Sequence, residues 1–297
     1  MIRSRKELTK AVLIVSPSIA AITVFVYGFI LWSLRTSVSA WEGIRPNYTF
    51  VGLRNYARLF RSSRFQIDLW NTAYFTVFFI AVCIVFGFLL AYLINKQIRG
   101  EGFFRTVYMF PMALSFIVTG VLWRWVLNPT AGVNVLLAGL GLPSSWGWYT
   151  DTTRIGGFHL ALISIIAAAS WQFIGYTMAI YLAGLRSIPE QLLESARMDG
   201  ANEFTIIRRI ILPMLRPITL SAMIVLGHIS LKIFDLVMAM TGRGPAFATD
   251  FPGVFMFETT FRGNRYGEGA AISTVMLLMV AVVIVPYLAY TFRKEHS

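Results

Sequence analysis

The stretch Ser187 to Pro217 reads SIPEQLLESARMDGANEFTIIRRIILPMLRP, and it is polar and charged between two long apolar runs. Those runs occupy residues 158–182 before it and 218–240 after it. A helix needs about 20 apolar residues to cross a bilayer, and both runs reach that length. The stretch is therefore predicted to be a loop between two membrane-spanning helices, and the same test divides the rest of the chain.

Four further runs are long and apolar enough to span, and they occupy residues 11–34, 71–94, 107–127 and 270–292. The first is too long for a signal-peptide core, so we expect it to be a retained span. Spanning backbone must satisfy its own hydrogen bonds, and no run alternates as a barrel strand does. The sequence therefore predicts an all-α membrane protein with six transmembrane helices.

The expected organisation has three parts. Residues 1–70 hold the N-terminal tail, the first helix and an external loop. Residues 71–292 form a core of five helices that includes the loop 187–217, and residues 293–297 form a tail.

Composition agrees with a lipid environment. Hydrophobic residues make up 57% of the 297 residues, charged residues only 13%, and the mean hydropathy is +0.66. This is too apolar for an ordinary soluble domain. The net charge of +12 does not indicate nucleic-acid binding, because the basic residues lie between apolar runs instead of forming a stripe. The single cysteine, Cys83, excludes an intrachain disulfide.

Basic residues predict the orientation. Outside the spans, 14 Lys and Arg lie on the side of the two termini and 10 on the other side, which places both termini and the loop 187–217 in the cytoplasm. The loop 35–70 opposes this assignment, because its six arginines fall on the external side. Leu53, Tyr56, Leu59 and Phe60 have helical spacing there, so we expect a short helix lying on the membrane surface.

No motif in the sequence indicates an enzymatic function. It contains no phosphate-binding Gly-x-x-x-x-Gly-Lys-Ser/Thr, no His-Glu-x-x-His and no Gly-x-Ser-x-Gly. The histidines, at 159, 228 and 296, are far apart in the sequence. We therefore expect no catalytic residues, no metal site and no cofactor in this chain, and a membrane-embedded enzyme is the less favoured reading.

The loop 187–217 carries signals for two short helices. Ser187 and Glu190 have capping-box spacing, and Pro189 suits the first turn of a helix. Gly200 predicts a stop and Asn202 a cap for a second helix.

The first of these helices is predicted to be amphipathic. Leu192, Leu193 and Ala196 gather toward one side, while Glu194 and Arg197 lie elsewhere. Such a helix suits docking into a groove of another protein. A solvated hairpin that merely joins two spans is the alternative.

A family resemblance bears on that alternative. The loop resembles the EAA loop of type I ABC importer permeases at Glu194, Ala196, Gly200, Ile210, Leu212 and Pro213. Asp199, Gly200 and Ala201 give the common Asp-Gly-Ala form, and Ser195 stands where the family usually has Ala. The resemblance implies a coupling helix that inserts into a cleft of a separate ATPase subunit.

The resemblance extends along the chain. Residues 50–60, 71–72, 104–129 and 241–245 look like signatures of carbohydrate permeases of the maltose/glycerol-3-phosphate type, nearest to the glucose/mannose branch. Arg243 stands where the family usually has the first Gly of Gly-Gly-Pro. The resemblance implies a sugar-importing subunit in a bacterial cytoplasmic (inner) membrane. Its implied partners are a second permease, two ATPase subunits that bind ATP and Mg, an extracytoplasmic solute-binding protein, a sugar and membrane lipid.

Polar residues inside the spans are candidates for the substrate pathway, since intramembrane ionisable groups tend to face a bundle interior or a wet cavity. His228, Lys232 and Asp235 fall at i, i+4 and i+7, on one face of the expected fifth span, with Ser230 beside them. Lys232 and Asp235 could pair. Alternatively, that pair only joins this subunit to a partner.

The fourth span adds Trp171, Gln172 and Tyr176, which combine aromatic faces with hydrogen-bonding edges. The alternative is an aromatic residue near the interface and a buried amide bonded to the backbone. Alignment with maltose-type permeases favours Gln172, Tyr176 and Ser230 as sugar contacts. An ion-coupled secondary transporter could use Asp235, but such carriers are built from internal repeats and none is visible.

Overall fold

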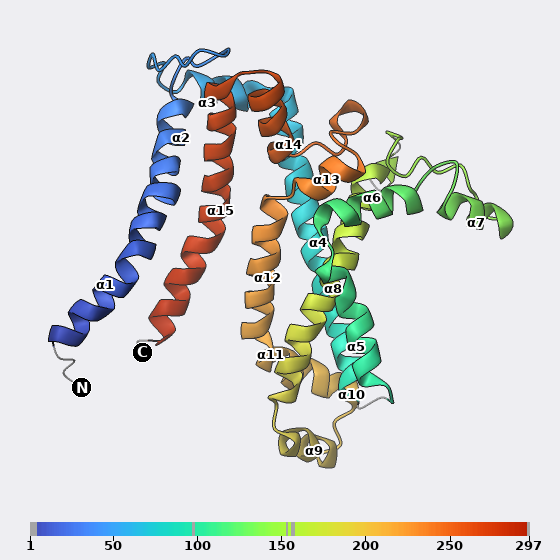
Figure 1. Cartoon of the computed structure of the whole chain (residues 1–297). Coiled ribbons are helices and arrows are strands. Elements are labelled where there is room, and N and C mark those ends of the chain that lie inside the picture. Colours follow the sequence, from blue (N-terminus) through green and yellow to red (C-terminus); the bar gives the residue numbers. More distant parts are fainter. Residues whose placement is uncertain (1–4, 97–98, 153, 156–157, 296–297) are drawn as a thin grey trace. The chain divides into compact units, whose positions relative to one another are not determined.

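The structure, a computed structural model, describes residues 5–96, 99–152, 154–155 and 158–295. It divides into two compact units, shown within the whole chain in Figure 1. Unit 1 comprises Met1–Ser62 and Phe255–Leu277, and unit 2 comprises Ser63–Val254 and Leu278–Ser297. The domain boundaries that the sequence predicted, at residues 70 and 292, stay predictions. Two residues of the predicted tail 293–297, Ser297 and its neighbour His296, lie outside the described residues.

The chain is mainly helical, which confirms the predicted fold class. The α-helices are α1 (Arg5–Ile22), α2 (Phe29–Ser37), α3 (Arg54–Arg61), α4 (Ser63–Asn95), α5 (Glu101–Met109), α6 (Phe116–Val126), α7 (Val133–Gly139), α8 (Leu160–Arg186), α9 (Glu190–Met198), α10 (Glu203–Ile206), α11 (Leu212–Met214), α12 (Arg216–Leu231), α13 (Asp235–Met240), α14 (Pro252–Phe257) and α15 (Tyr266–Glu295). Short π-helical segments occupy Thr23–Gly28, Ile207–Ile211 and Glu258–Arg262, and 3-10 turns occupy Phe110–Ala113 and Pro245–Phe247. The strands β1 (Arg154–Ile155) and β2 (Phe158–His159) form one antiparallel pair.

Long apolar helices account for the predicted spans. Four are long and apolar enough to cross a membrane singly: Val12–Ser37, Ser63–Asn95, Leu160–Arg186 and Tyr266–Tyr287. Two bent pairs pass the same test together: Glu101–Ala113 with Phe116–Val126, bent by 103°, and Glu203–Met214 with Arg216–Leu231, bent by 65°. The described part of the chain thus holds six candidate spans when each bent pair counts as one.

The predicted continuous helix over 107–127 is wrong, because the chain turns between α5 and α6. Leu114 is extended, with ψ 145°, and Ser115 starts α6 by accepting a hydrogen bond from the Val118 amide at 3.3 Å. Gln172 of α8 donates to the Leu114 carbonyl at 2.7 Å. The turn therefore has its own cap and a part-buried hydrogen bond from a neighbouring helix.

Unit 1 is held by an aromatic contact between its two stretches of chain and by hydrogen bonds within the first stretch. Trp41 stacks on Tyr266 with ring centroids 4.8 Å apart, and Asn55 donates to the carbonyls of Ser37 and Ser39 at 2.9 Å each.

The predicted short helix in the loop 35–70 is present as α3. Leu59 is fully buried within the chain, whereas Leu53 is 71% exposed and Phe60 49% exposed. Only part of its apolar side therefore packs internally, and its position on the membrane surface stays a prediction.

Unit 2 is built on the packing of α4 against α8. Two glycines allow close approach. A Cβ at Gly87 of α4 would lie 2.7 Å from the Cβ of Thr177, and one at Gly175 of α8 would clash with the carbonyl of Tyr108 in α5. Small residues let helix backbones approach closely, as they commonly do in membranes. Fully buried Phe75 and Phe79 of α4 fill the core beside them.

Helix α4 is longer than a bilayer core. Its 33 residues extend about 50 Å at 1.5 Å per residue, against a hydrocarbon core of about 30 Å. Its most apolar part follows residue 71, so its first two turns extend beyond the apolar stretch. Asp68 lies in those turns and is fully buried by protein.

Candidate functional site

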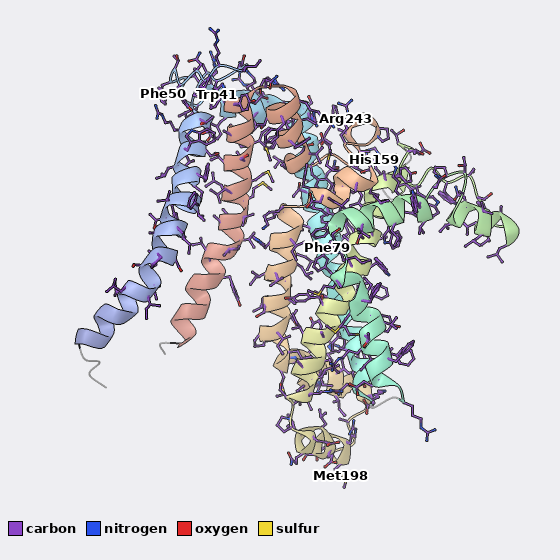
Figure 2. All side chains as sticks on the ribbon, in the orientation of Figure 1. Trp41, Phe50, Phe79, His159, Met198 and Arg243 are labelled. Carbon is purple, nitrogen blue, oxygen red and sulfur yellow. The ribbon has the colours of Figure 1, made fainter. Side chains whose placement is uncertain are left out.

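The connecting segment, residues 187–217, joins α8 to α12 in unit 2. Figure 1 shows α9 at one end of this unit, away from α6 and α13, and Figure 2 places Met198 at its tip. Met198 is 88% exposed and Phe204, at the start of the second helix, is 70% exposed. The segment thus presents large apolar side chains outward in the isolated chain.

The turn between the two short helices has the predicted form. Gly200 has φ +78°, its amide bonds the Arg197 carbonyl at 3.0 Å, and the Ala201 amide reaches back to the Ala196 carbonyl at 3.0 Å. This is the Schellman ending, which favours glycine because a Cβ is strained at positive φ. Asn202 caps α10 by accepting from the Thr205 amide at 2.8 Å.

The predicted capping box is wrong. Helix α8 runs on to Arg186, so Ser187 closes that helix and donates to the Gly184 carbonyl at 2.8 Å. Pro189 is the extended residue before α9, and no side chain caps that helix end. The Ser187 hydroxyl therefore caps the end of α8 rather than the start of α9. The sequence did not reveal that α8 extends as far as Arg186.

Helix α9 has an inner and an outer face. Leu193 and Ala196 are partly buried and pack against the apolar core that includes Ile188 and Leu185. Leu192, predicted on the same side, is 42% exposed, and Glu194 is exposed on the surface. The inner face is therefore narrower than predicted, and Leu192 is available to a partner.

The predicted coupling residues also divide into exposed and partly buried side chains. Exposed residues are Glu194, Ser195, Asp199, Gly200 and Leu212, and partly buried residues are Ala196, Ala201, Ile210 and Pro213.

The connecting segment is fastened to the bundle at its second half. Ile206, Ile211 and Leu215 are buried in the core that α4 and α8 share with it. Glu203 accepts from the Tyr92 hydroxyl at 2.7 Å and pairs with Arg197 at 3.2 Å. The second half of the segment is therefore packed against α4 and α8 and is not a loose loop.

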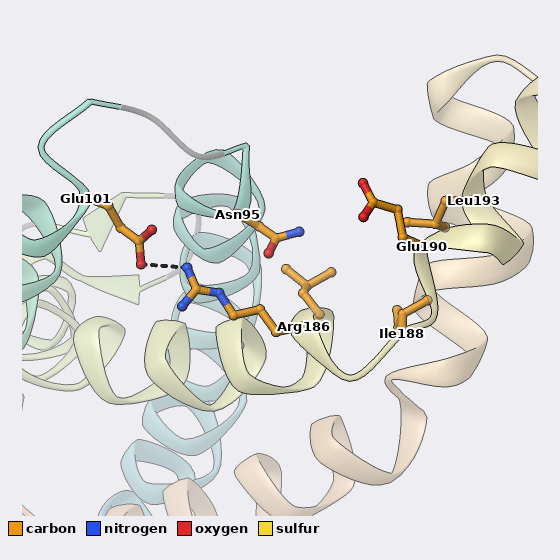
Figure 3. Close-up of a pocket in the computed structure, with 7 residues that line it drawn as sticks. Asn95, Glu101, Arg186, Ile188, Glu190 and Leu193 are labelled. Carbon is orange, nitrogen blue, oxygen red and sulfur yellow. Dashed lines mark hydrogen bonds and ion pairs between the residues drawn. The ribbon is translucent and has the colours of Figure 1, made fainter.

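An open cavity of about 630 Å³ lies beside α9, where the ends of α4, α5 and α8 meet (Figure 3). Arg186 and Glu101 form an ion pair at 2.5 Å across it. Its lining residues are Asn95, Glu101, Leu185, Arg186, Ile188, Glu190 and Leu193. Sequence reasoning missed this cavity, because its residues come from four separate helix ends.

The pathway candidates of α8 contact its neighbours. Gln172 is 3% exposed, and its side-chain amide donates a hydrogen bond to the Leu114 carbonyl. Trp171 makes an edge contact with Trp123 of α6 at 6.0 Å between ring centroids. Tyr176 is partly buried against the core.

The predicted continuous face of His228, Lys232 and Asp235 is wrong. Helix α12 ends at Leu231, Lys232 and Phe234 leave helical geometry, and Asp235 begins α13. Lys232 and Asp235 are both exposed, and no ion pair joins these two described side chains. The chain turns because α13 buries Leu236, Val237 and Met240 and packs against α6.

Ser230 and His228 lie deeper in the protein. Ser230 is fully buried, receives a hydrogen bond from Thr76 at 2.9 Å and donates to the Gly227 carbonyl at 2.8 Å. His228 is partly buried, and its Nδ1 has no hydrogen-bond partner among the described residues. In the described ranges, no group of three His, Cys, Asp or Glu side chains is placed to hold a metal ion.

Sequence reasoning also missed a buried charged cluster at the other end of unit 2, formed by Arg64, Asp68 and Asp250. The usable signal was Asp68, an acidic residue three positions before an apolar run of spanning length.

Comparisons with known proteins show similarity to membrane transport components. The family described as the binding-protein-dependent transport system inner membrane component matches residues 83–294. A probable ABC transporter permease protein of Pyrococcus horikoshii is 40% identical over 295 residues and covers 99% of both chains. The xylose/arabinose import permease protein of Haloferax volcanii is 37% identical over 276 residues, which are 92% of this chain and 84% of its own length.

A solved structure has the same fold. It is a bacterial ABC transporter involved in the import of the acidic polysaccharide alginate, with a TM-score of 0.77, 23% identity and 94% of each chain covered. These relatives give the ion-coupled carrier no support, and they are transport components rather than enzymes.

Proposed function

We propose that this chain, which belongs to the family of binding-protein-dependent transport system inner membrane components, is the sugar-translocating permease subunit of an ATP-driven ABC importer. The observation that carries the proposal is the connecting segment 187–217, whose helix α9 is exposed on one face and packed into the bundle on the other. The names of relatives supply the substrate class, since they include permeases for xylose/arabinose and for trehalose/maltose.

The partners follow from this role. A second permease of similar fold completes the pathway, and two ATPase subunits bind ATP and Mg and receive α9. An extracytoplasmic solute-binding protein delivers the sugar. An alginate transporter of the same fold was solved with an alginate-bound periplasmic protein, which supports this last partner. The chain lies in the cytoplasmic membrane with both termini and the segment 187–217 inside.

Movement of α9 is the proposed mechanical step. Closure of the ATPase subunits displaces α9, and the buried residues Ile206, Ile211 and Leu215 pass the displacement to the bundle. The sugar then reaches a cavity between the two permeases, as in alternating access. The proposed pathway residues are Trp171, Tyr176, His228, Ser230, Lys232 and Asp235. Gln172, whose amide donates to the Leu114 carbonyl, holds the turn between α5 and α6 instead.

The test changes the outer face of α9. Glu194→Arg reverses an exposed charge, and Gly200→Trp adds bulk at a left-handed turn, so both should leave the chain inserted and its complex uncoupled. Substrate-stimulated ATP hydrolysis and uptake in the purified, reconstituted complex are measured. Thr150→Arg, an exposed change on the predicted external side, is the matched control. If both α9 variants hydrolyse ATP and import sugar like the parent, the coupling role is wrong.

A further inference from the structure

A buried charged cluster fastens one segment of unit 2 to the first turns of α4. The segment is 241–251, between α13 and α14, and Figure 2 places its Arg243 at the end of the unit opposite Met198. Asp68 of α4 and Asp250 of the segment are both fully buried, and Arg64 of α4 is mostly buried.

Asp250 is paired. Arg64 donates from Nε to its Oδ2 at 2.5 Å, and the Phe251 amide donates to its Oδ1 at 3.2 Å. These donors give the Asp250 carboxylate both a counter-charge and hydrogen bonds, which a buried charge requires.

Asp68 differs. Both of its carboxyl oxygens are buried, and neither has a hydrogen-bond partner among the described residues. The nearby donors are used elsewhere: Thr72 bonds the Asp68 backbone carbonyl at 2.7 Å, and Asn71 bonds the carbonyls of Phe247 and Asp250 at 3.0 Å each. Arg64 lies one helical turn before Asp68 on α4 and pairs with Asp250, and Asn71, which follows Asp68, bonds the Asp250 carbonyl, so this stretch of α4 carries Asp68 beside both groups.

The arrangement lacks one positive charge. Two carboxylates face one guanidinium, and two neighbouring ionised carboxyls cannot bond each other because both only accept. A single proton supplies the missing donor and removes the uncompensated charge, as in other close carboxyl pairs. A metal ion fits less well, because Arg64 already occupies the cationic position beside Asp250.

We propose that Asp68 and Asp250 form a proton-binding site, and that the bound proton fastens the segment 241–251 to α4. The fastening is needed because Ala246 and Phe247 have φ +50° and +62°, a left-handed region unfavourable for residues other than glycine. Arg64 also lies over the Phe247 ring at 4.9 Å, and Arg243 covers the same ring at 5.5 Å. Loss of the proton at alkaline pH leaves two like charges side by side and releases the segment.

Infrared spectroscopy of the reconstituted complex tests the proton directly. The parent at neutral pH should show a protonated-carboxyl stretch that Asp68→Asn removes. Asp250→Asn should remove it too, because Asp68 then has Arg64 without a competing carboxylate. Asp151→Asn, at an exposed site, is the control and should leave the band. A band untouched by both cluster variants, or absent from the parent, overturns the proposal.

Thiol labelling tests the fastening. A cysteine at Ala248, which is 1% exposed, should label slowly at neutral pH and severalfold faster at alkaline pH. A cysteine at exposed Thr150 corrects for the reagent's own pH dependence, and the parent, whose Cys83 is buried, gives the blank.

The Asp68→Asn variant should differ from the parent in this assay. In the Asp68→Asn background the amide donates at every pH, so corrected labelling should stay low. An equal pH response in parent and variant, or none in the parent, overturns the fastening. Neither the infrared band nor the thiol labelling depends on transport. The proposed function can therefore fail while this inference holds, and this inference can fail while the proposed function holds.

Discussion

At the scale of single residues, Gln172 shows how a polar group inside a span can be structural. It is buried, and its amide serves the carbonyl of Leu114 where the chain turns between α5 and α6. Gln172→Leu would leave that part-buried carbonyl without its donor, and the loss of one such hydrogen bond costs about 0.5–1.5 kcal/mol.

We therefore expect Gln172→Leu to lower the thermal unfolding midpoint of the purified complex, with uptake per assembled complex nearly retained. Gln191→Leu, at an exposed position of α9, is the control for stability and should leave the midpoint unchanged. An unchanged midpoint together with a raised KM for sugar would instead make Gln172 a substrate contact.

At the scale of elements, the sequence located the six apolar segments but neither of the two breaks inside them, after α5 and between α12 and α13. The bend after α5 had readable signals, since Pro111 precedes it and Ser115 caps the next helix. The break between α12 and α13 has neither proline nor glycine, as residues 231–234 read LKIF. It depends on the burial of Leu236 and Val237 after the break, which helical periodicity alone cannot reveal.

The connecting segment was more predictable because its signals are local. The glycine stop at Gly200 and the Asn202 cap follow from backbone geometry and one side-chain hydrogen bond. Ser187 was misassigned because the length of α8 depends on packing against distant α4.

The α12–α13 break changes the expectation for Lys232 and Asp235. Both side chains are exposed and unpaired with each other, so Lys232→Met and Asp235→Leu should have additive effects on the unfolding free energy. Each should change it by only about 0.5 kcal/mol, the usual range for surface sites. A double-mutant cycle by thermal unfolding measures this. A coupling energy well above the error would show that a buried pair forms in the assembled protein.

At the scale of the whole molecule, orientation rests on basic residues. The 14-to-10 distribution predicts that the segment 187–217 is cytoplasmic and that the loop 128–157 is external. An impermeant thiol reagent on intact cells should therefore spare a cysteine at Arg197 and label one at Asp151, both exposed positions. The cysteine at position 197 should react only after the membrane is permeabilised. The reverse pattern would invert the topology.

The most direct test of the central claim is a disulfide cross-link between α9 and the ATPase subunit in the assembled complex. Ser195 is exposed on α9, and its hydroxyl donates to the Gln191 carbonyl within the same helix, so Ser195→Cys should disturb little. Paired with cysteines in the ATPase cleft, it should form a disulfide cross-link that stops ATP-driven sugar uptake. Reduction of the disulfide should restore uptake. Thr150→Cys should form none. Failure of Ser195→Cys to cross-link at any cleft position, with uptake intact, would contradict the account.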